Sequence, residues 1–217
     1  MMFTDNCTLT NHDDYLDMLI LNGIKPEAIK SPLAKKPSTV ADVMRVMLMD
    51  RYGGGWLDTD VLLLRPLSKS YSQPGITAMK WGNGKIDSYA VFTGEGSKTA
   101  LGEWKSRVLE GLLKAASHPD EYRHTDTGTP VLKEINDLYP MNLHDEALSI
   151  GGMLMRSAFK FPPRQKHFAQ LDALNGVHFG NSANSHYFDH KSFKEILDER
   201  TLMSVVMERV FYNARTM

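Results

Sequence analysis

Residues 40–64 constrain the fold more than any other segment, because a helix, a glycine run and a strand follow one another there without a linker. The helix, expected over residues 39–51, is apolar almost all round, which is typical of a buried helix. Thr39 is the expected cap of its first turn. Tyr52 and three consecutive glycines end it, and such a run favours a tight reversal in which the backbone passes close to another group. A strand is expected over residues 56–64.

Two charged residues interrupt this apolar helix. Asp42 and Arg45 stand three residues apart, so they lie on one face of the helix. A buried charge is costly unless it is paired or faces a polar site. The two side chains therefore either pair with each other or form a narrow solvent-facing strip, or they face a polar cleft in which Arg45 meets an anion. The sequence leaves both interpretations open.

The strand after the glycines carries two aspartates, Asp58 and Asp60, whose carboxylates share one face if the strand is continuous. Carboxylates that close repel each other, and burial raises the cost. A hard divalent cation such as Mg²⁺ or Mn²⁺ would remove both problems. The alternative is a strand that ends at Leu57, with both aspartates in a turn.

Predicted helices and strands alternate along the rest of the chain, which places it in the α/β class. Helices are expected over residues 13–22, 99–116 and 129–138, with one or two more over 191–212, and strands over 76–81 and 89–93. Residues 1–3 resemble the end of a short strand, and residues 25–37, with three prolines, are expected to be irregular. A length of 217 residues suits one core, so residues 1–217 are expected to form a single domain.

Composition argues against several function classes. A formal net charge of -1 argues against a general nucleic-acid binder, which is usually basic. Cys7 is the single cysteine, so the chain can form neither a disulfide framework nor a cysteine-rich zinc site. The start lacks the pattern of a secretory signal, and no run approaches the roughly 18 apolar residues that a membrane span needs. A cytoplasmic protein without a transmembrane segment is therefore expected.

The block from Ala41 to Asp60, with Tyr-Gly-Gly-Gly-Trp-Leu before its aspartates, resembles the Asp-X-Asp sugar-binding region of GT-A-fold glycosyltransferases. The set it resembles comprises bacterial capsular and lipopolysaccharide sugar transferases, yeast initiation-specific mannosyltransferases and clostridial glucosylating toxins. The resemblance implies a Rossmann-type mixed sheet flanked by helices. Family members usually carry a strand and a helix before the counterpart of Phe3, and this first βα unit is expected to be missing here.

The resemblance also implies an activity: metal-dependent, retaining transfer of a sugar from a nucleotide-diphosphate donor to a hydroxyl of a glycan or other acceptor. Asp42 would bind sugar hydroxyls, and Asp58 would bind ribose, sugar or metal. Asp60 would ligate Mn²⁺ or Mg²⁺ directly, and it is the expected catalytic residue together with Arg45, which would bind sugar or phosphate. The other expected donor-binding residues are Gly54, Gly55 and Trp56.

Weaker resemblances continue downstream. The loop at residues 125–130 is similar to the family's Thr-Gly-Pro loop, and residues 161–163 are similar to its Phe-Tyr-Pro segment. Residues 177–182 are similar to its closing His-containing segment, in which His178 and Asn181 would approach the metal. An isolated histidine is more often a structural group, so both interpretations of His178 stay open. Asp87 either faces the donor or acceptor or lies in a solvated loop.

Two other function classes compete with a transferase. Phosphatases with a nucleophilic aspartate also use Asp-X-Asp, but their motif ends an apolar strand, whereas here the apolar run follows Asp60. The second alternative is a truncated, catalytically inactive domain that binds metal or nucleotide sugar or depends on a partner.

Overall fold

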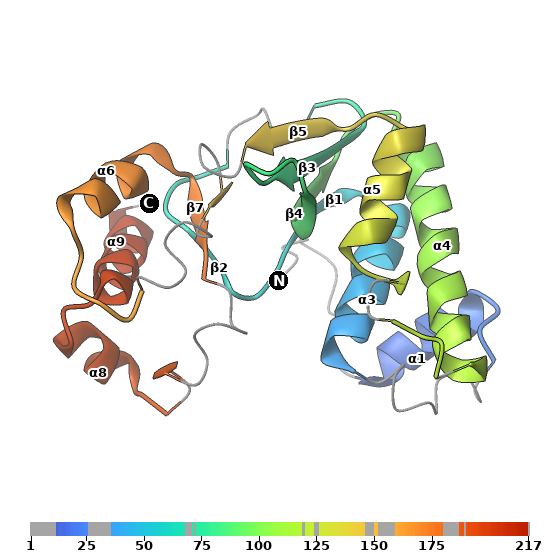
Figure 1. Cartoon of the computed structure of the whole chain (residues 1–217), viewed down its shortest axis with the longest axis horizontal. Coiled ribbons are helices and arrows are strands. Elements are labelled where there is room, and N and C mark those ends of the chain that lie inside the picture. Colours follow the sequence, from blue (N-terminus) through green and yellow to red (C-terminus); the bar gives the residue numbers. More distant parts are fainter. Residues whose placement is uncertain are drawn as a thin grey trace.

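The computed structural model contains two sheets with helices at both ends of the molecule (Figure 1). The alternation of helices and strands and the mixed sheets confirm the expected α/β class. The expected strand at residues 1–3 lies outside the described residues. The structure describes residues 12–25, 36–67, 71, 73–118, 120–123, 126–145, 150–151, 159–179, 187–188 and 190–216.

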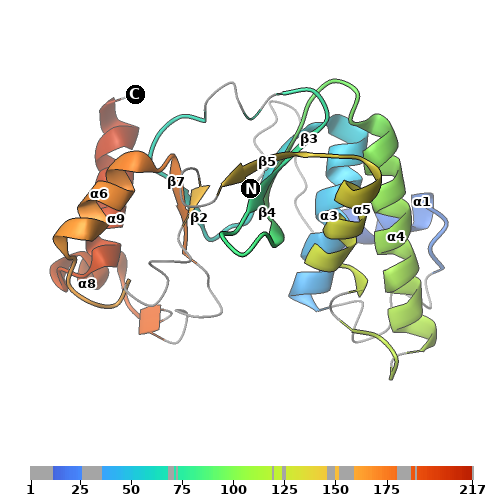
Figure 2. The same cartoon turned by 45° about the horizontal axis from the view of Figure 1, so that its top comes forward.

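The larger sheet is mixed and has the strand order β1-β4-β3-β5. β4 runs antiparallel to both of its neighbours, whereas β5 runs parallel to β3. The four strands are β1 (Gly54–Leu57), β3 (Ile76–Lys80), β4 (Ile86–Thr93) and β5 (Asn142–Asp145). Four helices lie together at this end of the molecule (Figures 1 and 2): α1 (His12–Leu21), α3 (Pro37–Tyr52), α4 (Lys98–Ser117) and α5 (Thr129–Leu138).

The smaller sheet, in the order β2-β7-β6, belongs to the other end of the molecule. Here β7 runs antiparallel to β2 and parallel to β6. Its strands are β2 (Val61–Leu63), β6 (Ile150–Gly151) and β7 (Gly176–His178). The helices at this end are α6 (Gln165–Ala173), α8 (Phe193–Asp198) and α9 (Leu202–Thr216). The C-terminal segment thus forms two helices, as expected, although α9 extends beyond residue 212 to Thr216.

Helix α3 is buried, as its apolar sequence predicts. Val43, Val46 and Met49 are at most 1% exposed and join the core that α4 and the larger sheet share. Each apolar side chain of this size contributes roughly 1.5–3 kcal/mol when it is fully removed from water. Two predictions about the start of α3 are wrong. The helix begins at Pro37, whose missing N–H costs nothing in a first turn, so Lys36, not Thr39, is its N-cap.

The glycine run makes the expected tight reversal. Gly53 and Gly54 have φ angles of 67° and 85°, in the left-handed region that glycine adopts without strain. A Cβ atom on Gly55 would lie 2.6 Å from the Phe92 ring on β4. The run thereby turns the chain from α3 directly into β1, and its last glycine lets β4 approach closely.

The strand expected over residues 56–64 is two strands that belong to different sheets. β1 pairs with β4 and ends at Leu57, whereas β2 begins at Val61 and pairs with β7. Asp58 and Asp60 lie in the turn between them, which the Val61 N–H closes by donating to the Asp58 carbonyl at 3.0 Å. The continuous face of alternating side chains is therefore wrong, and the alternative of a turn is confirmed. A strand paired on both sides would have buried these carboxylates among apolar neighbours.

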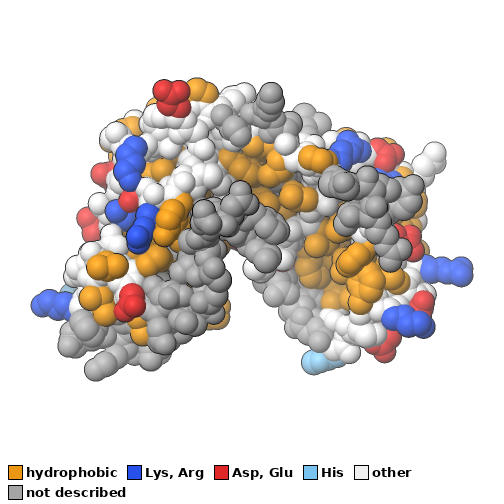
Figure 3. Space-filling model, turned by 180° about the vertical axis from the view of Figure 1, so that it is seen from behind, with side chains coloured by type: hydrophobic (Ala, Val, Ile, Leu, Met, Phe, Trp, Pro, Cys, Tyr) orange, Lys and Arg blue, Asp and Glu red, His pale blue; other side chains and the backbone are white. Residues whose placement is uncertain are grey.

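Most other expected elements lie where the apolar pattern predicts them, and α5 matches to the residue. β4 is longer than expected, because it begins at Ile86 and includes Asp87. The solvated-loop interpretation of Asp87 is therefore wrong. Lys, Arg, Asp and Glu side chains are interspersed over the face that Figure 3 shows, in keeping with a net charge near zero.

Candidate functional site

Arg45 lies at the centre of a buried ion network. Its side chain is 4% exposed, and its Nη1 donates to Asp42 Oδ1 at 2.6 Å. Its Nη2 donates to Asp58 Oδ1 at 2.9 Å. Arg45 thus makes the ion pair along its own helix and also meets a second anion, which comes from the turn after β1. Its Nε is buried and has no hydrogen-bond partner among the described residues.

Trp56 on β1 holds the same oxygen of Asp58. The indole Nε1 donates to Asp58 Oδ1 at 2.6 Å, and the Arg45 guanidinium carbon lies 5.1 Å from the centroid of the ring. A cation over an aromatic face is attracted by the ring's quadrupole, so Trp56 supports both partners. The Asp58 side chain is 31% exposed, and its Oδ2 accepts no hydrogen bond from the described residues. A ligand-binding role of that oxygen stays a prediction.

Three hydroxyl groups extend the network beyond Asp42. Thr127 Oγ1 donates to Asp42 Oδ2 at 3.3 Å, and the Tyr122 hydroxyl links Thr127 to Thr39 at 3.2 and 3.0 Å. Burial raises the pKa of the Asp42 carboxyl and outweighs Arg45, which lowers it. Sequence reasoning placed a family-like loop around Thr127 but missed this contact and Tyr122, because no local pattern joins positions so far apart.

Asp60 and His178 face each other across the smaller sheet. Val61 pairs in register with His178, and the Phe179 N–H donates to the Asp60 carbonyl at 2.8 Å. As a result, His178 Nε2 lies 3.4 Å from Asp60 Oδ1. The structure thus brings His178 beside the aspartate turn, and its expected approach to a metal stays a prediction.

An aromatic ring also packs against the face of the His178 imidazole. Its ring stacks on Tyr89 of β4, with centroids 4.1 Å apart and planes 21° apart. Its Nδ1 is buried and has no hydrogen-bond partner among the residues described. This stacking links the two sheets next to Asp60.

Asp87 on β4 belongs to the same electrostatic group. The Ser88 N–H donates to its Oδ1 at 2.7 Å. Burial raises the pKa of the Asp87 carboxyl, and the negative charge of Asp58 raises it further, while Ser88, His178 and Lys85 act in the opposite direction. The ionised Asp87 carboxylate therefore lowers the stability of the folded protein unless a cation or a further hydrogen-bond donor binds to it.

We expect Asp87→Asn to stabilise the protein at pH 7 by about 1 kcal/mol, a common gain when a strained functional group is removed. With aspartate, stability is highest below the unfolded pKa of about 3.8 and falls as the pH rises through the raised folded pKa. The gain should therefore be absent at pH 3 and complete at neutral pH. Urea unfolding from pH 3 to 8 measures it, with Asp137→Asn, an exposed position on α5, as control. A pH-independent effect of Asp87→Asn would contradict the assignment.

The other expected site residues are placed as follows. Gly54 and Gly55 lie in β1 and pair with residues of β4. The Gly54 carbonyl also accepts a hydrogen bond from Thr93 Oγ1 at 2.9 Å, so both glycines have a structural role in the larger sheet. Their donor-binding role stays a prediction. Asn181 lies outside the described residues.

The metal prediction depends on Asp60 and His178. No group of three or more His, Cys, Asp or Glu side chains that could hold a metal ion is present in the part of the chain that the structure describes. A carboxylate and an imidazole are nevertheless ligands that suit Mn²⁺, and these two already face each other. The open oxygen of Asp58 is the third candidate on the same turn. A metal held by these residues stays a prediction.

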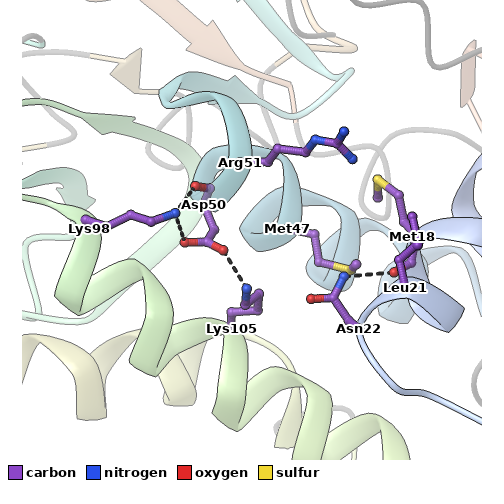
Figure 4. Close-up of a pocket in the computed structure, with 8 residues that line it drawn as sticks. All are labelled: Met18, Leu21, Asn22, Met47, Asp50, Arg51, Lys98 and Lys105. Carbon is purple, nitrogen blue, oxygen red and sulfur yellow. Dashed lines mark hydrogen bonds and ion pairs between the residues drawn. The ribbon is translucent and has the colours of Figure 1, made fainter.

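Two clefts are relevant to ligand binding. One, of about 270 Å³, begins at Thr59 and Asp60 and is otherwise lined by apolar side chains of the smaller sheet and of α8 and α9. The other, of about 310 Å³, lies between α1, α3 and α4 (Figure 4). The expected site residues that the structure describes all lie outside this second cleft.

Asp50 organises the second cleft. It accepts hydrogen bonds from Lys98 at 2.8 Å and from Lys105 at 2.5 Å (Figure 4). Burial raises the pKa of the Asp50 carboxyl, but the hydrogen bonds from Lys105 and Lys98 outweigh it, and the pKa lies below its usual value. Asp50 therefore acts as a partner that joins α3 to α4.

The comparisons with known proteins address the first half of the chain. Residues 8–109 match the family model described as capsular polysaccharide synthesis protein, which is 102 of the 217 residues. No curated protein and no solved structure matches the chain. Among the described residues, no helix has both the length and the apolar character that a membrane crossing requires. The matched segment contains Asp42, Arg45, Asp58 and Asp60, and the match supports a relation to capsular polysaccharide synthesis proteins.

Proposed function

We propose that this protein is a glycosyltransferase that moves a sugar from a nucleotide-diphosphate donor to a hydroxyl acceptor. The observation that carries the proposal is the aspartate turn between the two sheets, tied to Arg45 and lying within the segment that matches capsular polysaccharide synthesis proteins. Polysaccharide synthesis requires both a sugar donor and an acceptor. The site offers these ligands carboxylates on three different elements.

The charge balance of the site favours a ligand rich in hydroxyl groups. Burial raises the pKa of both Asp42 and Asp87, and the negative charge of Asp58 raises the pKa of each of them further. Sugar hydroxyls donate hydrogen bonds to carboxylates without bringing further negative charge, so they would stabilise these groups in their ionised form. We assign Asp42 and Asp58 to sugar or ribose hydroxyls.

The diphosphate needs positive charge, and this would come from Arg45 and a cation. Both terminal nitrogens of Arg45 are paired with carboxylates, so its first role is to position Asp42 and Asp58. Asp60 and His178 would hold Mn²⁺ or Mg²⁺, with Mn²⁺ better suited to the imidazole. A bound divalent cation would stabilise the charge that develops on the leaving diphosphate. Retention of configuration remains part of this proposal, and no base is assigned.

A panel of nucleotide sugars tests the proposal by thermal unfolding with and without Mn²⁺. At a ligand concentration 100 times its Kd, stability rises by about 2.7 kcal/mol, and a domain of this size gains roughly 2–4 °C in Tm per kcal/mol. We therefore expect one nucleotide sugar with Mn²⁺ to raise the Tm by several degrees. Mn²⁺ alone and the free sugar serve as controls, because the matching nucleoside diphosphate shares the ribose and diphosphate of the donor and is expected to bind as well. If no nucleotide sugar raises the Tm beyond these controls, the proposal is wrong.

A binding domain without catalytic activity is the second candidate function. The closed Arg45 network favours it, because a guanidinium that is 4% exposed and already paired is hard for a diphosphate to reach. In that case the same nucleotide sugar would raise the Tm but would be neither hydrolysed nor transferred. Release of nucleoside diphosphate under saturating Mn²⁺ distinguishes the two functions.

A further inference from the structure

The apolar cleft beside Asp60 has a chemistry that the nucleotide-sugar donor does not explain. It measures about 270 Å³ and is lined by parts of β2, the end of β7, α8 and α9. Thr59 and Asp60 supply the polar side chains of its lining, and both belong to the turn between the two sheets. The cleft is therefore continuous with the candidate site.

The walls of the cleft combine fixed rings with adaptable side chains. The ring of Phe179 packs edge-on against those of Phe159 and Phe188, with centroids 5.7 and 5.3 Å apart. Met203 and Met207 of α9 line another part of the wall. Methionine is unbranched and adjusts to irregular apolar shapes, whereas packed aromatic rings keep theirs. This wall suits a flexible hydrocarbon.

Neither a sugar ring nor a diphosphate matches such walls, because their polar groups would be buried there without hydrogen-bond partners. An alkyl chain gains roughly fourfold in affinity for each methylene that it buries. Asp60 in the lining can meet a hydroxyl group, while Leu62 and Met207 belong to the apolar part of the lining. A ligand that is polar at one end and apolar at the other fits both features.

We infer that this cleft binds an alkyl aglycone of the sugar acceptor, with the polar end of the acceptor directed to the Asp60 turn. The role as acceptor site rests on the proposed transferase function. The affinity for an alkyl group does not, since it follows from the lining of the cleft alone. The two statements can therefore be tested separately.

Binding of octyl and methyl glycosides of the same sugar to the full chain, measured by calorimetry below the micelle concentration of the octyl compound, tests the inference. We expect saturable binding of octyl glycoside to one site, at least tenfold tighter than methyl glycoside. Met207→Glu, at a partly buried position on α9, should remove most of this difference. Met18→Glu, at a partly buried position in the other cleft, should leave it unchanged. Met207→Ala, expected to weaken octyl binding at least threefold, replaces Met207→Glu if that variant does not fold.

Two outcomes overturn the inference: equal binding of octyl and methyl glycosides, or unchanged octyl binding in both Met207 variants. The donor experiment separates this failure from failure of the proposed function. Binding of a nucleotide sugar without any effect of chain length refutes the alkyl site alone. Octyl binding that depends on Met207, without a Tm rise from any nucleotide sugar, refutes the transferase function and supports the alkyl site.

Discussion

Arg45→Met is expected to lower the free energy of unfolding by about 3–5 kcal/mol, the cost of removing one partner from a buried ion pair. Methionine retains most of the volume of the side chain but leaves Asp42 and Asp58 without their cation. The total stability of a domain is only about 5–15 kcal/mol, so the variant should be close to unfolding. Urea unfolding at pH 7 measures the loss.

The pH dependence of this variant identifies the cause of its loss. Without Arg45 the pKa of Asp42, already raised by burial, rises further, so the native protein more readily takes up a proton at acidic pH. A raised folded pKa favours the native state at low pH, and the deficit should therefore shrink as the pH falls toward the unfolded value of 3.8.

Two further variants separate charge from geometry. Arg45→Lys keeps the charge but cannot span Asp42 and Asp58 with a planar fork, so we expect an intermediate loss. The double variant with Asp42→Asn should recover part of the stability of Arg45→Met, because one uncompensated carboxylate is gone. Equal losses for Arg45→Met at pH 5 and pH 8, with no recovery in the double variant, would contradict the network.

Asp60→Asn is expected to lower Mn²⁺-dependent release of nucleoside diphosphate from the cognate nucleotide sugar by at least about 100-fold. A cation at the leaving group supplies several kcal/mol of transition-state stabilisation, and each 1.4 kcal/mol is a factor of ten. Urea unfolding of Asp60→Asn at pH 7 measures whether the variant keeps the stability of the unmodified protein. Steady-state kinetics over a range of Mn²⁺ concentrations measure the effect.

Binding of the metal itself gives an independent measurement. Titration of Mn²⁺ followed by electron paramagnetic resonance should show weaker binding in Asp60→Asn and in His178→Gln, while Asp137→Asn binds as the unmodified protein does. Unchanged Mn²⁺ binding in Asp60→Asn would refute Asp60 as the metal ligand. Weaker Mn²⁺ binding with unchanged turnover would show that the cation takes no part in the reaction.

The sequence predicts some parts of the site because neighbouring residues define them. Helical periodicity places Asp42 and Arg45 on one face, and the structure confirms their ion pair. The apolar pattern likewise predicts the burial of α3, and the glycine run predicts the reversal that follows it. Such features depend on the backbone geometry of one segment, which a linear pattern describes well.

Other parts follow only from pairing between distant segments. The strand breaks at Asp58 because β1 pairs with β4 whereas β2 pairs with β7 in the other sheet. The alternation of side chains along residues 56–64 is the same whether the segment forms one strand or two. Thr127 meets Asp42 across 85 positions of sequence. His178 likewise reaches Asp60 only through the register of β2 with β7.

The sequence by itself thus determined the helix, its Asp42–Arg45 pair and the reversal that leads to the two aspartates, because each depends on residues a few positions apart. The tertiary structure alone decided that both carboxylates leave the sheets, that Asp58 shares Arg45 with Asp42, and that an apolar cleft begins at Asp60. These arrangements depend on strand pairing and side-chain burial between segments far apart in the chain. The free energy that stabilises these arrangements comes from contacts between residues far apart in the sequence, and a local sequence pattern does not describe such contacts.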